Sequence, residues 1–278
     1  KGDIVLEIET PAALSEDPVK VFVVANVGTP LNEMYIGLEI DGNWKYIKKS
    51  AAPAGGFKRG NTYIVNVDSD LATDAPEYPE SSTSAVLIAG RWWAPQNCGY
   101  TPSVTDGLYY QWHRKYGQTY STTNYENGPV TLATGNNVLN SGVIYLAPDP
   151  PNDWCSESQS SWSMTTSYNP CPSGWRVPTD TELQGLVNSG STWQSTSGNE
   201  GRWYGGNHSG DHERSVFIRA AGRRDYATGA AGGIDVHGRY WSSSTTSTNG
   251  VSFRFDASSS GVYQNAKSWG FTLRCVKE

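Results

Sequence analysis

The stretch Gly238–Glu278 constrains the fold of this chain of 278 residues more than any other part. Large side chains gather at its two ends, whereas its middle consists almost wholly of small and polar residues. Within that middle, Val251, Phe253 and Phe255 alternate with Ser, Arg and Asp, which is the period of a strand buried on one face. The pattern predicts a strand that packs its apolar face on a core and displays its polar face. A merely solvated polar face is the alternative.

Three rings near the ends of this stretch are predicted to anchor it in the core. They are Trp241, Trp269 and Phe271, and aromatic side chains of this size contribute much of the area that a core buries. The displayed segment between them is therefore expected to be held by fixed ends.

The composition favours an irregular, turn-rich fold with more strand than helix. Only 17% of the residues are charged, while 37% are hydrophobic and 30 are glycines, a mixture typical of β-rich chains. The net charge is −6 and no run of Lys or Arg occurs, so nucleic acid is not expected as a partner. No segment approaches the roughly 20 apolar residues that a membrane helix needs, and we expect no membrane span.

An uneven distribution of charge predicts two units. Residues 1–85 hold 7 Lys and Arg against 13 Asp and Glu, whereas residues 86–278 hold 14 of each sign. Residues 68–85 are rich in acids, prolines and hydroxyl side chains and have almost nothing to bury, which is typical of a linker. We therefore predict a small antiparallel β-domain over 1–67, a linker over 68–85 and a larger α+β domain over 86–278.

The first domain is predicted from short strand-like runs. They lie at 4–8, 19–25, 34–40, 44–47 and 63–67, and Asp-Gly-Asn at 41–43 is a hairpin signal because glycine adopts the positive φ of a tight turn. The run F-x-x-G-x-x-Y at 57–63 resembles the entry to the last strand of fimbrillin-like pilus domains. That resemblance implies a fimbrillin-like first unit.

The larger domain carries one clear helix signal. Thr179 is followed three residues later by Glu182, the pattern of a capping box, and leucines then repeat at helical spacing, which predicts a helix over 180–188. We also expect a strand at 216–220, a glycine-rich loop over 221–238, and a long loop-like region over 121–170.

Four cysteines lack the spacing of a zinc or redox site. Two disulfides in an oxidising compartment are favoured, and of the three connectivities we predict Cys171–Cys275 together with Cys98–Cys155. Buried free thiols are the alternative.

No catalytic or metal site is predicted. His208 and His212 have metal-ligand spacing only on a helix, and the glycines around them make a helix improbable. His113 and His237 are isolated and are expected to be packed or surface imidazoles. Residues 151–154, PNDW, resemble the Asn-Asp pairs of calcium-dependent lectins but lack the partnering motif. We therefore expect no metal and no cofactor.

Six motifs follow one another through residues 86–278. They are RWWAPQN, GLYYQW, NPCPSGWRVPTDTEL, VFIRAAGRRD, GRYWSSS and GFTLRCVKE. Together they resemble the Fibrobacter major paralogous domain, a family with a C-type-lectin-like fold that is shared by formylglycine-generating enzymes and by the variable proteins of diversity-generating retroelements. The resemblance implies binding rather than catalysis, because the enzymes need a reactive cysteine pair and Cys275 matches the family's structural cysteine.

The predicted protein is an extracellular adhesin of a bacterial cell surface or pilus tip, not an enzyme. Its partner would be a host or bacterial surface glycan or protein, with other pilus subunits as possible partners of the first domain. A structural pilus subunit without a ligand site is one alternative, and an enzyme of the formylglycine-generating type is another. The predicted ligand-binding residues, with side chains suited to adaptable contacts, are Thr245, Thr246, Thr248, Asn249, Ser252, Arg254, Asp256, Tyr263 and Asn265, with Arg223 and Asp225 at the rim.

Overall fold

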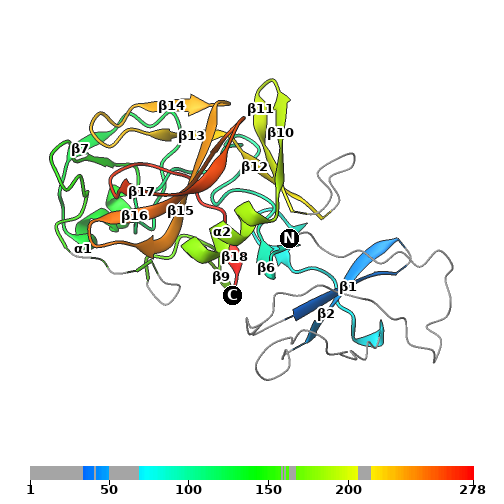
Figure 1. The fold of residues 1–278 in the computed structure, drawn as a ribbon. Helices are drawn as coiled ribbons and strands as arrows, with labels where there is room; N and C mark the ends of the chain where they lie inside the picture. The colour runs from blue at the N-terminus through cyan, green and yellow to red at the C-terminus, as the bar shows by residue number, and fades with distance from the viewer. Residues whose placement is uncertain are drawn as a thin grey trace. The chain divides into compact units, whose positions relative to one another are not determined.

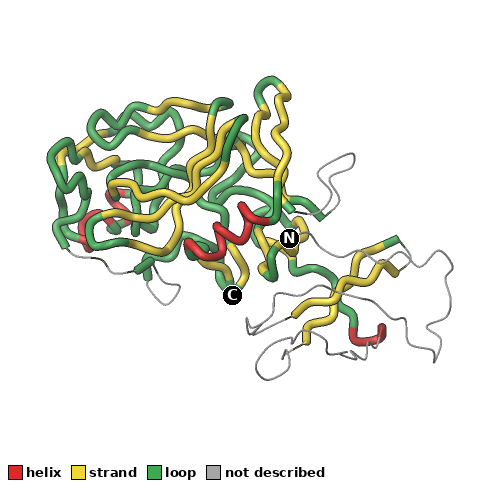
Figure 2. Tube along the Cα trace, in the orientation of Figure 1, coloured by secondary structure: helices red, strands yellow, loops and turns green. Residues whose placement is uncertain are grey.

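The computed structural model describes residues 34–40, 42–49, 69–157, 159, 161–162, 167–205 and 214–278. Of these residues 43% are strand and 9% are helical, so the protein is a mixed α+β chain dominated by strands, as predicted (Figure 2). The chain divides into two compact units, Lys1–Ala75 and Pro76–Glu278. No helix among the described residues is long and apolar enough to cross a membrane.

The described part of the first unit contains a β-hairpin. Strands β1 (Met34–Ile40) and β2 (Asn43–Lys49) pair antiparallel along their whole length, and Gly42 adopts a φ of 74° in the turn between them. This hairpin confirms the turn predicted from Asp-Gly-Asn, because glycine tolerates positive φ without steric cost. The short helix η1 (Ser69–Leu71) follows. The other predicted strands of this unit and the fimbrillin-like run at 57–63 lie outside the described residues.

The second unit is built from short strands with little helix (Figure 1). Its helical elements are α1 (Leu132–Gly135), η2 (Val138–Asn140) and α2 (Asp180–Asn188). Its strands are β3 (Glu77–Tyr78), β4 (Thr83–Ser84), β5 (Val86–Ile88), β6 (Arg91–Trp93), β7 (Tyr125–Asn127), β8 (Ile144–Leu146), β9 (Trp175–Arg176), β10 (Ser191–Thr196), β11 (Asn199–Tyr204), β12 (Val216–Arg219), β13 (Ala221–Arg224), β14 (Ala231–Ile234), β15 (His237–Thr245), β16 (Asn249–Asp256), β17 (Ser260–Ala266) and β18 (Val276–Lys277).

A five-stranded sheet carries the stretch that dominates the sequence. Its strand order is β14-β13-β15-β16-β17, and β15, β16 and β17 pair antiparallel. One face packs on a core that contains Tyr240, Phe253 and Phe255, all at most 1% exposed. The buried alternation predicted for β16 is therefore confirmed.

Helix α2 covers part of this core and begins as predicted. The Thr179 side chain accepts from the backbone of Glu182, whose carboxylate accepts in return from the Thr179 backbone, so two N–H groups at the helix start are satisfied. Glu182 also pairs with Arg91 and Arg176 at 2.7 and 2.6 Å. Leu186 on the inner side is fully buried in the same core.

Two segments differ from the loop predictions. Residues from Pro76 onward belong to the second unit, and Tyr78 in β3 is fully buried with its ring 4.9 Å from that of Trp175. The composition of 68–85 conceals this anchor because one buried ring attaches a segment that is otherwise mostly exposed or half-buried. The glycine-rich run 221–238 forms the hairpin β13–β14 rather than a loop, with glycine at the positions where backbones approach closely.

The cysteine predictions are half right. Cys171 and Cys275 form a disulfide, which confirms the first pair. The pairing of Cys98 with Cys155 is wrong, since both are buried free thiols. The Cys98 sulfur contacts the Tyr110 hydroxyl and the Pro170 carbonyl, each at 3.3 Å, whereas Cys155 packs in a separate core cluster.

Candidate ligand-binding site

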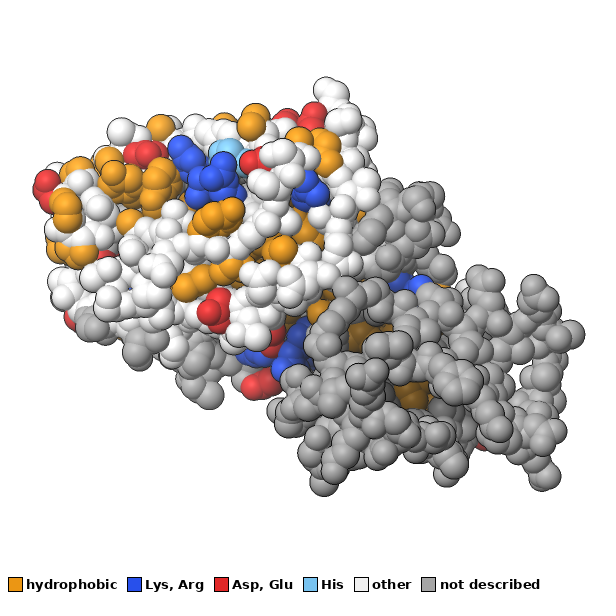
Figure 3. Space-filling view, in the orientation of Figure 1, with side chains coloured by type: hydrophobic (Ala, Val, Ile, Leu, Met, Phe, Trp, Pro, Cys, Tyr) orange, Lys and Arg blue, Asp and Glu red, His pale blue; other side chains and the backbone are white. Residues whose placement is uncertain are grey.

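The face of the β13–β17 sheet opposite the core carries arginines on three adjacent strands. Arg239 on β15 lies directly opposite Arg254 on β16 in the antiparallel register. Gly222 on β13 pairs with Gly238 on β15, which places Arg223 beside Arg239. We call these three residues, Arg223, Arg239 and Arg254, the arginine row. Figure 3 shows basic side chains gathered next to a histidine on this side of the molecule.

The positive charges of the arginine row lie close enough to repel one another. Burial, with the positive charges of Arg223 and Arg254, lowers the pKa of Arg239 to about 10. Burial and the positive charges of the row, that of Arg239 first, lower the pKa of the adjacent His237 to about 4, so this imidazole is neutral at pH 7. Like charges directly opposite one another destabilise a strand pair. The row therefore carries a cost that the fold itself does not require.

Partners for these charges are few. Within the described chain, the side chains of Arg223 and Arg239 make no hydrogen bond or ion pair, and the Nε of Arg239 is buried without an acceptor. Arg254 approaches Asp256 at 3.7 Å, with 42% of the arginine side chain exposed. An exposed pair at that distance contributes little stability, so the row retains a net positive charge.

Aromatic rings support the row. The guanidinium of Arg223 lies 4.7 Å from the centre of the Trp269 ring and that of Arg239 lies 5.6 Å from Phe271, which orients both cations. Trp269 is half-buried rather than a core residue, so its predicted place is wrong, whereas Phe271 is fully buried as predicted. Tyr263 on β17 is 46% exposed and is close enough to Arg239 to influence its pKa.

The predicted site residues fall into two groups. Arg223, Arg254 and Tyr263 meet at the arginine row. A second group lies at the opposite end of the strands, in the β15–β16 hairpin. There Thr245 and Thr246 donate to the Asn249 carbonyl, and Thr248 is exposed in the turn. The structure therefore does not bring all the predicted residues to one place.

Two residues predicted to face a ligand instead hydrogen-bond to each other within the fold. Ser252 is fully buried and donates to Asn265 Oδ1 at 2.7 Å, although it lies on the same strand face as Arg254. The expectation of an exposed Ser252 is wrong because neighbouring structure covers this end of β16. Asn265 is half-buried and accepts that bond.

The two predicted aspartates stabilise turns. Asp256 accepts from the backbone and hydroxyl groups of Ser258 and Ser259, and these bonds lower its pKa to about 2. Asp225 accepts from Ala227 and Thr228 in the β13–β14 turn. An aspartate that accepts from the backbone two or three residues further on is typical of such turns. A structural role thus accounts for both.

The sequence analysis missed Arg239 and His237 as members of the site. Strand periodicity could have identified both. Each precedes the inward-facing Tyr240 by an odd number of residues, which places it on the outer face of the strand.

Comparison with protein-family models, with curated proteins and with solved structures finds no match to this chain.

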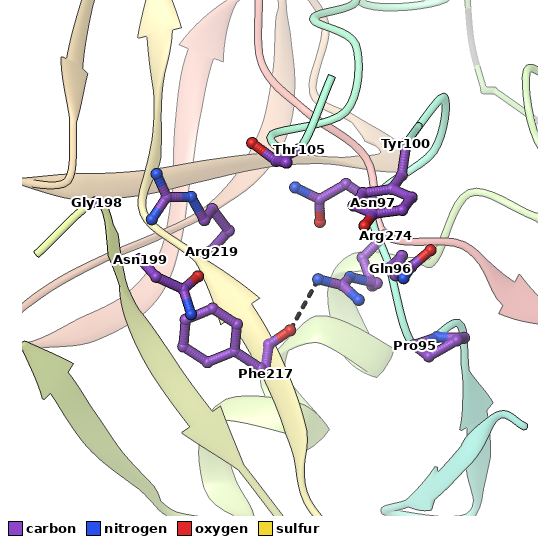
Figure 4. A pocket seen from close by; sticks show the side chains of 10 residues that line it. All are labelled: Pro95, Gln96, Asn97, Tyr100, Thr105, Gly198, Asn199, Phe217, Arg219 and Arg274. Carbon is purple, nitrogen blue, oxygen red and sulfur yellow. Dashed lines mark hydrogen bonds between the residues drawn. The ribbon is translucent and has the colours of Figure 1, made fainter. Parts of the chain in front are cut away.

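A second surface feature lies away from the arginine row (Figure 4). It is a pocket of about 420 Å³ that includes Asn97, Arg219 and Arg274. Arg219 pairs with Asp106 and Asp235 at 2.8 and 2.7 Å, and Arg274 donates to two backbone carbonyls, one of them Phe217 (Figure 4). These guanidinium groups are already used by the fold, which makes the pocket the weaker candidate for ligand binding.

The free thiol of Cys98 tests the enzyme alternative. Its sulfur lies within 4.8 Å of both sulfurs of the Cys171–Cys275 bridge, so a third cysteine does lie beside the bridge. Burial raises the pKa of Cys98 to about 12, and only the thiolate is nucleophilic. The structure thus places the Cys98 sulfur close to the bridge but does not favour its nucleophilic thiolate form.

We therefore expect Cys98 to resist alkylation in the folded protein. Iodoacetamide at pH 8 should modify it only when denaturant is present, because the folded chain holds it as a protonated and inaccessible thiol. Peptide mass spectrometry after each treatment measures the modification, and the denatured sample is the control. Rapid labelling of Cys98 in the native chain would contradict this expectation and strengthen the case for an enzyme.

Proposed function

We propose that this protein is an extracellular adhesin whose second unit binds a ligand through the outer face of the β13–β17 sheet. The observation that carries the proposal is the arginine row: like charges from adjacent strands, of which two, Arg223 and Arg239, have no hydrogen bond or ion pair among the described residues, while Arg254 has only a long contact to Asp256. Such groups destabilise the free protein and become favourable when a ligand supplies the missing contacts. Destabilising arrangements of this kind are common where function requires them.

Further support comes from the side chains around the row. Tyr263 offers a rigid, exposed ring, and tyrosine and arginine are the residues that most often dominate binding energies. The similarity of six sequence motifs to the Fibrobacter major paralogous domain supports a lectin-like fold for this unit and, with it, a role in binding. A surface location agrees with the disulfide, since disulfides persist in oxidising compartments.

A binding screen tests this proposal. The whole chain would be applied to an array of surface glycans and proteins, beside the double variant Arg254→Ala/Tyr263→Ala. We expect at least one ligand to bind, and the variant to bind it about tenfold or more weakly.

Matched variants give the screen its specificity. Lys115→Ala/Tyr116→Ala removes another cation and ring, which lie 5.9 Å apart in a different segment, and should leave binding unchanged. Thr246→Ala/Thr248→Ala tests the hairpin end of the strands and should also bind normally. Loss of binding in either control but not in the arginine-row variant would place the site elsewhere, and absence of any ligand would favour a structural pilus subunit.

A further inference from the structure

Resting on the proposed function, we infer that the arginine row binds an acidic saccharide, with guanidinium groups paired to its carboxylates and Tyr263 in contact with a sugar ring. The inference concerns the chemical class of the ligand. It follows from the charge of the row, from the geometry of the strands and from the shape of the surface around them.

The first step is charge. Among the described residues, one carboxylate is paired with the three guanidinium groups: Asp256, whose Oδ2 lies 3.7 Å from Arg254 and whose Oδ1 accepts four hydrogen bonds from Ser258 and Ser259. One carboxylate does not balance three positive charges. The neighbouring imidazole of His237 has a buried Nδ1 without a hydrogen-bond partner. A ligand that removes the repulsion must therefore be an anion, and planar carboxylates match the fork of a guanidinium group.

The second step is spacing. The row crosses three adjacent strands, β13, β15 and β16, so its ends are about 10 Å apart at the usual separation of about 4.8 Å between strands. Charges set out on adjacent strands suit a ligand with repeated anionic groups. A polymer of acidic sugars has such a repeat.

The third step is shape. The two pockets described for this chain are lined by other residues, one by the group around Arg219 and the other along α2. Neither of these two pockets includes the row, and Tyr263 beside it is 46% exposed. An exposed tyrosine ring beside cations suits the flat apolar side of a sugar.

Polygalacturonate is a direct probe of this inference. We expect it to bind the whole chain, and its methyl-esterified form to bind much more weakly, because esterification removes the charge and leaves the sugar unchanged. Arg254→Glu should weaken polygalacturonate binding about ten- to hundredfold, the effect of losing a charged hydrogen bond. Lys115→Glu makes the same change of charge at another exposed position and should have little effect.

A stability measurement separates loss of the site from loss of the fold. Arg254→Gln removes one of the two opposed arginines, so its melting temperature should equal or exceed that of the parent while polygalacturonate binding falls. A lower melting temperature together with weaker binding would attribute the loss to unfolding and overturn the assignment of Arg254 to the site.

Further ligands identify the class. Binding of sulfated dextran but not of polygalacturonate would replace carboxylate by sulfate and overturn the inference, as would equal binding of polygalacturonate and its ester. Tight binding of polyglutamate alone would indicate an acidic peptide. A neutral glycan that binds in a Tyr263-dependent manner would refute the acidic ligand and still support the proposed function, whereas failure of every ligand in the array refutes the proposed function itself.

Discussion

Loss of the Cys171–Cys275 disulfide is expected to lower the free energy of unfolding by about 4 to 5 kcal/mol. The bridge joins residues 104 positions apart, and in the chain-entropy account a long closed loop restricts the unfolded chain most. It also attaches the final strand β18, which pairs with β6 and β9, to the segment before α2. Reversible denaturation followed by tryptophan fluorescence measures the effect, since ten of the eleven tryptophans lie after residue 85.

The neighbouring thiol determines how the variant must be built. Cys98 lies close enough to Cys275 to replace a missing Cys171, so a single Cys171→Ala variant could form a new bridge. The comparison is therefore Cys98→Ala against Cys98→Ala/Cys171→Ala. A difference below about 1 kcal/mol would show that the bridge does not restrict the unfolded chain in the way the loop length implies.

Local patterns in the sequence were sufficient for the elements whose causes are local. The capping box at Thr179 and Glu182, the Asp-Gly-Asn turn and the alternation of Val251, Phe253 and Phe255 each depend on neighbours a few residues apart, and each appears in the structure. The disulfide from Cys171 was predicted correctly, whereas Cys98 was paired wrongly because sequence spacing contains no information on which sulfurs meet in space.

The candidate site was only partly predictable for the same reason. Periodicity assigns Arg254 to the outer face, yet it cannot show that β15 aligns Arg239 opposite it, nor that Arg223 arrives from β13. Nor can it show that Ser252, on the same face, is covered. Strand register sets which arginines lie beside one another, and packing by other segments buries Ser252. Both depend on residues far away in the chain.

Residues 121–170 have little regular structure, as expected, and among the described residues only the short elements β7, α1, η2 and β8 interrupt them. Arg114, fully buried, holds much of this region in place. Its guanidinium donates to the carbonyls of Gly135 at 3.1 Å, Val143 at 2.7 Å and Asn140 at 3.1 Å, and it lies 5.0 Å from the centre of the Tyr145 ring. One side chain thus supplies the donors that a segment with little regular structure does not supply itself.

Replacement of Arg114 by methionine is therefore expected to cost about 3 to 5 kcal/mol of unfolding free energy, because three buried carbonyls lose their donor at once. Arg114→Lys should recover only part of this loss, since an ammonium group lacks the planar fork that reaches separate acceptors. Lys115→Met, at the exposed neighbouring position, is the control and should change stability by less than about 0.5 kcal/mol. Denaturant unfolding compares the three variants with the parent chain. If Arg114→Met proved as stable as Lys115→Met, the backbone of 121–170 would have to satisfy its own hydrogen bonds, and the charge of Arg114 would be buried without structural benefit.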